Sequence, residues 1–479
     1  VLIKGVIRDE MNTNLSGVTI NNLSTKNSAM SNDNGQFELY ASRGDSLNVS
    51  YVGYEPYKVV INNAITLNIV LKAVSNSMNE VVVIGYGQQK KISVVGAQSS
   101  VKVEDLKLPV ANLSTVLAGR ISGLVGVQRS GLPGSDGADL WIRGISSMSG
   151  ATGPLVVVDG VQGRDINSFD AEDISSFTIL KDAAATAVYG VAGANGVILI
   201  TTKKGVTGKP SLMFNYNQGF TSFTKRPELT DGVTYMMLRN EARLATGMSK
   251  EYSNNYINNT ILGTDPYLYP NVNWMDQIFK DVAGNRRANF SARGGSEFST
   301  YYVSGAYYDE SSLLRTDELQ KYDATTRFKR YNFTSNVSMK FTPSTKFELG
   351  VQGYISNLNY PGVKPEDAFA NVMQTNPVLY PAMYPGNFVP GVSSAGAQPN
   401  PYAQITQTGY QNIFSNQVMS NARLSQDLGF WLKGLNFSAL YSFDIWNSHT
   451  INRTRSRSTY LINRLFPYDD AGNPILNSI

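Results

Sequence analysis

The sequence predicts a mainly β protein in three parts: a small N-terminal β-sandwich, a compact α+β unit, and the first strands of a large antiparallel transmembrane β-barrel. Short alternating strands separated by turn signals fill residues 1–72. Residues 155–205 read as a buried β-run, a Gly turn, a small-residue helix and a second β-run. From residue 206 onward, amphipathic strands are joined by alternately short and very long connections.

Composition excludes several classes of function. The 479 residues contain no Cys and one His, His449, so disulfides, thiolate metal sites and multi-His metal sites are not expected. Forty-one Lys and Arg against 37 Asp and Glu give a net charge of +4, without a basic block that could follow a phosphate backbone. Nucleic acid is therefore not an expected partner, and neither a metal nor an organic cofactor is expected.

Composition also points to a membrane. Tyr (27) outnumbers Phe (20), and charged residues make up 16% of the chain, against about 25% in ordinary soluble domains. No apolar run reaches the ~18 residues that a transmembrane helix needs. A chain of this kind would cross a bilayer as a closed barrel with aromatic belts at both interfaces.

Residues 1–72 carry the pattern of a β-sandwich. Asn32-Asp33-Asn34-Gly35 and Arg43-Gly44-Asp45 are tight-turn signals. They separate strands that we expect at 3–9, 17–24, 35–41, 46–61 and 65–72. No catalytic constellation is visible in this part, which is compatible with a spacer domain.

The linker, residues 73–92, contains the segment EVVVIGYG. A dinucleotide-binding interpretation fails, because Lys90 occupies the place of the third Gly and no helix start follows. An extended β-prone peptide between polar residues can instead add as a strand to the sheet edge of a partner. The alternative is an ordinary strand of the next unit.

Residues 93–205 predict an α+β unit. Leu113, Val116, Leu117 and Ile121 have helical spacing. Asn112 or Ser114 is expected to cap this helix, and Gly119 and Gly123 to end it. The segment LVVVDGVQ (155–162) is expected as a strand closed by Asp159-Gly160. Asp182 is expected to cap a helix over 183–189, and Gly190, Gly193 and Gly196 form a turn before a strand over 197–205. The acids of this unit fit turns and segment starts better than a catalytic pair, and Arg120 and Arg143 are expected to pair with acids here or on the barrel wall.

Residues 206–479 alternate as the wall of a barrel does. Tyr331, Phe333, Val337, Met339 and Phe341 face one way and Asn332, Thr334, Asn336, Ser338 and Lys340 the other. Short links at 294–298, 342–345 and 429–434 alternate with long ones at 222–286, 310–328 and 358–416. We count seven strands, whereas a plugged transporter has about 22. The barrel would therefore be incomplete, being either a fragment or completed by another chain.

Five segments in order, LAGRISGLVGV, WIRG, PLVVVDG, DISSFTILKDAAATAVYG and GANGVILITTKKG, resemble the plug of SusC/RagA-type TonB-dependent outer-membrane transporters. By this resemblance residues 93–205 are the plug, and residues 1–72 resemble a carboxypeptidase-regulatory-like domain. The resemblance assigns a TonB box to Glu80, Val81, Val82, Val83, Ile84, Gly85, Tyr86 and Gly87. It assigns plug motifs to Gly119, Arg120, Arg143, Gly144, Asp159, Gly160, Lys181, Asp182, Tyr189, Gly190, Gly193, Asn195 and Gly196.

The resemblance implies energy-coupled import of a nutrient across a Gram-negative outer membrane, with no covalent chemistry. The implied partners are TonB with its ExbB/ExbD energy supply, a SusD-like surface lipoprotein and outer-membrane lipid, with the N-terminal domain and plug on the periplasmic or lumenal side. The long loops are rich in Tyr, Asn and Pro. They either stack on sugar rings, which favours an oligosaccharide over a peptide as cargo, or pack against a lid or the plug. The rival functions are a surface-binding or adhesive protein anchored by the barrel, and a hydrolase, for which no catalytic centre is visible.

Overall fold

The computed structural model describes residues 1–9, 13–25, 27–51, 54, 56–62, 66–72, 81–84, 87–90, 98–101, 110–144, 152–316, 322–392 and 399–479. It contains two compact units, Val1–Val95 and Gly96–Ile479. Among the described residues, no helix is long and apolar enough to span a membrane.

The first unit contains a two-layered β-sandwich, as the sequence predicts. One sheet has the order β4 (Gln36–Tyr40), β1 (Leu2–Asp9), β7 (Thr66–Leu71). The other has the order β3 (Ser28–Met30), β2 (Thr19–Asn22), β5 (Ser46–Ser50), β6 (Tyr57–Val60). Every second residue of the longer strands points into the core, where Ile7, Ile20 and Leu47 are fully buried. The predicted strand over 46–61 is thus two strands that form an antiparallel hairpin.

Part of the predicted TonB box forms a hairpin in the first unit. Val81–Ile84 is strand β8, and Gly87, the last residue of the box, begins strand β9 (Gly87–Lys90). Val81 is in register with Lys90 and Ile84 with Gly87. Glu80, Gly85 and Tyr86 lie outside the described residues.

The plug, in the second unit, is built on a five-stranded sheet. Its order is β10 (Gln98–Val101), β15 (Ile174–Leu180), β16 (Val197–Thr202), β13 (Leu155–Val158), β14 (Val161–Gln162). A separate hairpin joins β11 (Leu124–Gln128) to β12 (Ala138–Ile142). The short helices are α1 (Leu113–Leu117), η4 (Ile166–Ser168), η5 (Ala171–Asp173), α2 (Ala183–Thr186) and η6 (Ala187–Gly193).

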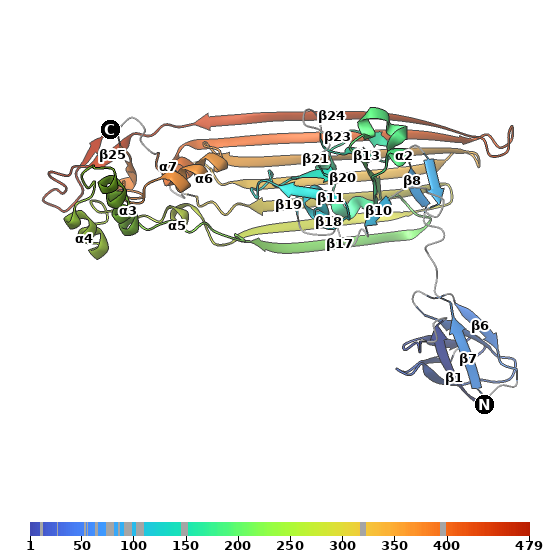
Figure 1. Ribbon diagram of the computed structural model, residues 1–479. Helices are drawn as coiled ribbons and strands as arrows, with labels where there is room; N and C mark the ends of the chain where they lie inside the picture. Colours follow the sequence, from blue (N-terminus) through green and yellow to red (C-terminus); the bar gives the residue numbers. More distant parts are fainter. Residues whose placement is uncertain are drawn as a thin grey trace. The chain divides into compact units, whose positions relative to one another are not determined.

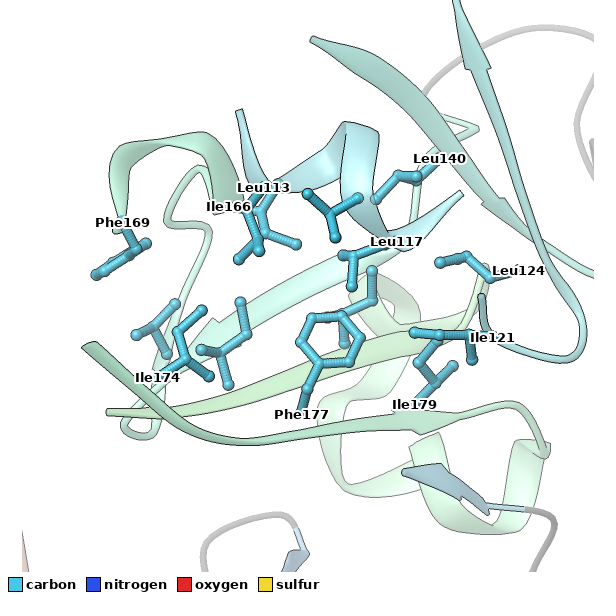
Figure 2. Close-up of a cluster of buried hydrophobic side chains, with 14 of the residues drawn as sticks. Leu113, Leu117, Ile121, Leu124, Leu140, Ile166, Phe169, Ile174, Phe177 and Ile179 are labelled. Carbon is cyan, nitrogen blue, oxygen red and sulfur yellow. The ribbon is translucent and has the colours of Figure 1, made fainter. Parts of the chain in front are cut away.

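The plug core lies between this sheet and helix α1. Leu117 and Ile121 meet Phe177 and Ile179 of β15, and Leu124 and Leu140 close the cluster from the β11–β12 hairpin (Figure 2). The helical spacing of Leu113, Val116 and Leu117 therefore marks a buried helix face, as predicted. The helix ends at Leu117, so that Ile121 reaches the core from the following turn.

Seven strands form the barrel sheet, in sequence order and antiparallel throughout (Figure 1). They are β17 (Gly208–Thr221), β18 (Ala283–Gly295), β19 (Ser299–Ser311), β20 (Arg327–Lys340), β21 (Thr345–Pro361), β23 (Gly409–Asp427) and β24 (Asn436–Thr454). The three short links, 296–298, 341–344 and 428–435, gather at one end of the sheet, where the plug also leads into β17. The mainly β class and the seven-stranded part of a barrel wall are confirmed.

The long connections fold at the opposite end of the sheet. They carry helices α3 (Gly232–Ala245), α4 (Asn254–Leu262), α5 (Trp274–Ile278), α6 (Pro365–Gln374) and α7 (Pro401–Gln407), together with the one-turn helix η7 (Pro385–Asn387). A small sheet of β22 (Val389–Pro390), β25 (Thr459–Ile462) and β26 (Leu476–Ser478) lies at this end too (Figure 1). Helices in these loops were not predicted.

Register separates the two faces of the sheet. Ser304 is paired with Thr334, and both contact the plug, so this row faces inward. The neighbouring row, with Phe290 and Phe333, therefore faces outward and exposes its aromatic rings. This apolar-out, polar-in alternation is the one that the sequence predicts for a lipid-facing wall.

Candidate functional site: the plug against the barrel wall

The Asp159-Gly160 turn is built as predicted and also connects plug and wall. Val158 pairs with Val161 across it, and both central residues have positive φ (52° and 90°), as a two-residue hairpin turn requires. The Asp159 carboxylate accepts hydrogen bonds from the Thr202 backbone N–H (3.0 Å) and hydroxyl (2.7 Å). Its backbone carbonyl accepts one from Arg423 of the wall (3.1 Å). The turn thus ties two plug strands together at the wall.

Asp182 does not cap its helix in the way that we predicted. It occupies the N-cap position of α2, but its side chain makes no cap hydrogen bond and pairs with Arg143 at 2.7 Å instead. Arg143 itself has a positive φ of 61° and donates its backbone N–H to Gly123. The expected pairing of Arg143 with a plug acid is therefore present, and it competes with the cap. The predicted helix over 183–189 is α-helical only to Thr186.

Neither Asn112 nor Ser114 caps α1. Asn112 stands at the N-cap without a side-chain cap bond and donates to Asp136 at 2.7 Å. The Ser114 hydroxyl accepts from the backbone of Ala138 at 2.9 Å. Asn112 thus connects the helix to the segment before β12 and Ser114 connects it to the first residue of β12, so tertiary contacts replace the predicted local ones.

The other predicted motif residues lie in turns around the same sheet. Lys181 donates to the Ser122 carbonyl, Tyr189 is buried, and Asn195 donates to the Gly153 carbonyl at 3.4 Å. Positive φ is found at Gly119, Gly144, Gly190 and Gly196. At Gly196 a Cβ would lie 2.6 Å from the Ile142 side chain, and at Gly193 it would lie 3.0 Å from the Thr186 carbonyl, so close packing also favours Gly there. Arg120 follows α1 and is exposed.

A buried carboxylate fastens the plug to three wall residues. Asp173 accepts hydrogen bonds from Tyr302 (2.8 Å), Ser304 (2.5 Å) and Thr334 (2.7 Å), which lie on β19 and β20. Burial and the neighbouring Asp170 raise the pKa of Asp173 to about 6. Three wall hydroxyl groups thus donate to one plug carboxylate, so Asp173 is the centre of the contact between plug and wall.

Two wall arginines hold the plug beside Asp173. Arg287 of β18 forms a buried ion pair with Asp170. Arg330 of β20 donates to the backbone carbonyls of Asn167 (2.8 Å) and Ala111. Two more contacts lie where the chain leaves the plug after β16. Asn336 of β20 donates to the Thr202 hydroxyl (2.9 Å) and to the Lys203 carbonyl (2.7 Å).

Sequence reasoning missed this network. It placed Asp173 near the start of a segment and counted Asp170 among the acids early in residues 170–182. Asp170 does accept from the Glu172 backbone N–H at 2.8 Å. Their partners on the wall were not identified. The available signal was the inward row of polar residues that includes Thr334 and Asn336, because polar groups facing a closed interior need partners.

The aromatic residues of the long loops form a core of their own. Trp274 and Tyr380 are each 1% exposed and meet edge to face with ring centroids 5.7 Å apart. Tyr384 is also buried and contacts Tyr267 (5.9 Å). These rings stabilise the loop assembly, so they are not free to stack on a sugar.

Two sequence families match the chain. The model of the TonB-dependent receptor plug domain matches residues 90–197, and that of the CarboxypepD_reg-like domain matches residues 3–83. The unit that lies against the antiparallel barrel sheet, as described above, is thus the plug domain that the first of these models describes. The plug is thus that of a TonB-dependent receptor, a class of outer-membrane β-barrel proteins and not of enzymes.

Relatives narrow the class. The TonB-dependent receptor SusC of Bacteroides thetaiotaomicron is 31% identical over 368 residues, which cover 74% of this chain and 34% of SusC. The TonB-dependent receptor P26 of Formosa agariphila is 32% identical over 344 residues (70% and 32%). The RagAB peptide importer in its open-open state superposes with a TM-score of 0.64 at 25% identity, covering 80% of this chain and 43% of that one. The chain belongs to the SusC/RagA type of TonB-dependent receptor. It spans about a third of the length of the curated relatives it matches.

Proposed function

We propose that this chain carries the gate of a TonB-dependent importer that brings a nutrient across a Gram-negative outer membrane. The observation that carries the proposal is the chemistry of the plug–wall contact. Hydrogen bonds and ion pairs from Asp159, Arg164, Asp170 and Asp173 hold the plug. The apolar core of the plug includes one wall residue, Met419, and a small separate cluster joins Ala111 of the plug to Tyr308 and Phe328 of the wall. Polar contacts exchange with water at low net cost, so a pulled plug can leave the wall without losing its core.

The proposal divides the chain by role. Residues 1–72 form an accessory β-sandwich, 73–92 the linker with the TonB box, 93–205 the plug, and 206–479 the wall. The sandwich and the plug lie on the periplasmic or lumenal side. This orientation is supported by the short links at the end where the plug enters β17, since such barrels have short periplasmic turns and longer external loops.

Glu80–Gly87 is proposed as the segment that TonB captures by strand addition. Val81–Ile84 is already extended and pairs only with β9 in the described structure, so its other edge offers backbone groups to a partner strand. Pulling would act next on β10, which is an edge strand held by four residue pairs to β15. β15 continues from η5, and Asp173 at the end of η5 is bonded to the wall. We therefore expect β10 to separate from β15 before β15 leaves the wall.

The cargo is proposed to be an oligosaccharide, with a peptide as the alternative. The inward face of the wall also carries uncharged polar residues such as Asn289 and Ser291, beside the charged residues that hold the plug. Amide and hydroxyl groups of this kind suit a neutral polyhydroxyl ligand. The likeness to a peptide importer supports the alternative. A SusD-like surface lipoprotein is proposed as the lid on the loop end, and the likeness to SusC and to the RagAB importer supports this partner.

Capture by TonB is the first test. Val82→Pro removes a backbone donor from the proposed strand, and Ser77→Pro places the same residue in the linker outside it. We expect Val82→Pro in the full-length receptor to abolish binding of the purified periplasmic domain of TonB and nutrient uptake by cells. Ser77→Pro should leave both unchanged.

The rival function gives the opposite result. A surface adhesin anchored by the barrel needs no captured strand, so cells with Val82→Pro would keep their surface binding. Neither these cells nor cells with the unaltered receptor would then take up the nutrient through this protein. Uptake that persists in Val82→Pro would instead make the protein a passive pore. Growth on single oligosaccharides and on peptides then separates the two cargo classes.

A further inference from the structure

The outward face of the barrel sheet changes from apolar to charged at one level. Tyr307 and Tyr331 stand side by side in one outward row, with ring centroids 5.0 Å apart, and Tyr216 lies in the same row on β17. The next outward row contains Arg286, Asp309 and Lys329. Arg327 follows one row further out. We name Arg286, Asp309, Arg327 and Lys329 the girdle cluster.

The position of the girdle cluster fits the external edge of the bilayer. The outward apolar band runs along β20 from Met339 to Tyr331, which is nine residues and eight residue-to-residue steps. At ~3.4 Å per residue and a tilt of about 40°, this span is roughly 20 Å along the membrane normal. Exposed Phe298 and Phe341 mark the opposite edge, beside the short links. The charged row thus begins where hydrocarbon ends, at the loop end of the sheet.

Asp309 holds both arginines in place. Arg327 donates through Nε and Nη2 to the two carboxylate oxygens, each at 2.6 Å. Arg286 donates through Nε at 2.9 Å and approaches with Nη2 at 2.7 Å. The Asp309 side chain is 3% exposed although it faces outward, because the two guanidinium groups cover it. The arginine side chains themselves remain 49% and 35% exposed.

The pairing leaves donors unused on the outer side. Neither Nη1 group of the two arginines has a partner within the parts of the chain described here, nor does the Lys329 ammonium, which is half-buried in register with Asp309. Asp323, before β20, is the other acid that acts on Arg327. Three cations, Arg286, Arg327 and Lys329, are therefore set against two carboxylates, and that of Asp309 is already covered by the two arginines.

We propose that the girdle cluster binds the phosphate of a phosphorylated glycolipid in the outer leaflet. Two guanidinium groups fixed side by side present planar N–H forks of the kind that match phosphate oxygens, and little side-chain entropy is lost on binding because Asp309 already orders them. The tyrosine row below supplies the surface on which the glycolipid's sugar and upper chains rest. The site lies on the outside of the wall, so it is separate from the plug and from the proposed import path.

The test uses the full-length receptor purified from outer membranes. Replacing the three paired residues together (Arg286→Gln, Asp309→Asn, Arg327→Gln) removes the clamp without leaving Asp309 as a buried unpaired charge. Arg453→Gln is the matched control, because it changes the net charge by the same one unit, faces outward on β24 and lies outside the girdle cluster. Heat-modifiable migration on a gel verifies that each barrel has closed.

Native mass spectrometry then measures binding of bis-phosphorylated lipid A and of the same lipid after its phosphates are removed. We expect the receptor and Arg453→Gln to prefer the phosphorylated lipid by at least about tenfold, and the triple variant to lose that preference. Equal binding of both lipids by the unaltered receptor would show that the lipid binds through its apolar chains and not through its phosphates, which would overturn the proposal. A preference retained by the triple variant, or occupation of this face by a protein with no lipid preference, would overturn it too.

Discussion

Arg164 in the plug and Asp444 on β24 form a two-point ion pair, with Nε to Oδ2 at 3.0 Å and Nη2 to Oδ1 at 2.8 Å. The Arg164 side chain is 1% exposed and that of Asp444 is 30% exposed. Arg164 also donates to the Ser420 carbonyl on β23 at 3.1 Å. One plug side chain thereby bridges two neighbouring wall strands.

Replacing Arg164 by Ala should loosen the plug by about 2 kcal/mol. Breaking a buried ion pair costs about 3–5 kcal/mol, and the partial exposure of Asp444 lowers that figure. Hydrogen exchange of the η4 amides in the full-length receptor measures the change. The Arg164→Ala/Asp444→Ala double variant should recover part of the protection, because no carboxylate is then left unpaired. Unchanged exchange in Arg164→Ala would show that the pair does not hold the plug.

Seating of the plug should weaken as the pH rises from about 4 to about 6. The pKa of Asp173 is raised to about 6 by burial and by Asp170, against about 3.9 for an unfolded Asp. Between these values the seated plug holds a proton that the released plug has lost, so rising pH favours release. The stabilisation of the seated plug by this proton is fully present below the pKa of an unfolded Asp. It is lost as the pH rises through the pKa of Asp173 in the seated plug.

Susceptibility of the plug to a protease, measured across this range, tests the pH dependence. Asp173→Asn keeps the size of the side chain but cannot titrate, so its profile should be flat. A matched control is Asp165→Asn, which removes a carboxylate that, among the described residues, accepts from the nearby Asn167 backbone N–H alone. If Asp173→Asn retains the slope of the unaltered receptor, another group is responsible.

The strands of this chain could be predicted because their signals are local. Alternation over 331–341 marks β20, and the Asp159-Gly160 pair marks a hairpin turn whose φ values few other residues adopt. Helix ends were predicted less well. Asn112, Ser114 and Asp182 are good capping residues in isolation, but each is drawn into a contact with a residue more than twenty positions away.

The plug–wall network could not be predicted from such signals. Asp173 meets Tyr302 and Thr334, which lie 129 and 161 positions further along the chain. Those pairings depend on how the plug sits against the inward row of the sheet, and no local pattern encodes that register. The loop aromatics illustrate the same limit. Trp274 and Tyr380 are residue types that are common on binding surfaces, but both are buried in the core of the loops.

Gly196→Ala should destabilise the plug by about 1–3 kcal/mol. Gly196 has a φ of +88°, and an added Cβ would lie 2.6 Å from Ile142 Cδ1 and 3.2 Å from the Leu180 carbonyl. The expected readout is faster hydrogen exchange in β16. Gly131→Ala is the control, since nothing lies within 4 Å of the added atom there. Equal exchange in the two variants would contradict the packing argument.

The turn between β23 and β24 should lie in the lipid at the periplasmic interface. Phe430, Trp431 and Leu432 are 81%, 78% and 63% exposed, yet the turn is ordered by bonds from the Trp431 and Leu432 amides to the Leu428 carbonyl (2.8 and 3.0 Å). Three consecutive exposed apolar side chains on an ordered turn suit an interfacial anchor.

Fluorescence in bilayers containing brominated lipids measures this contact. Trp431→Phe should lower the quenching of tryptophan emission by these lipids, whereas Trp274→Phe should leave it nearly unchanged, because Trp274 is 1% exposed within the loop core. Quenching should be stronger for bromine near the headgroup than for bromine near the chain end, since an interfacial ring lies at the headgroup level. Quenching that is the same before and after Trp431→Phe would place the turn in water, where its exposed rings would require a protein partner instead.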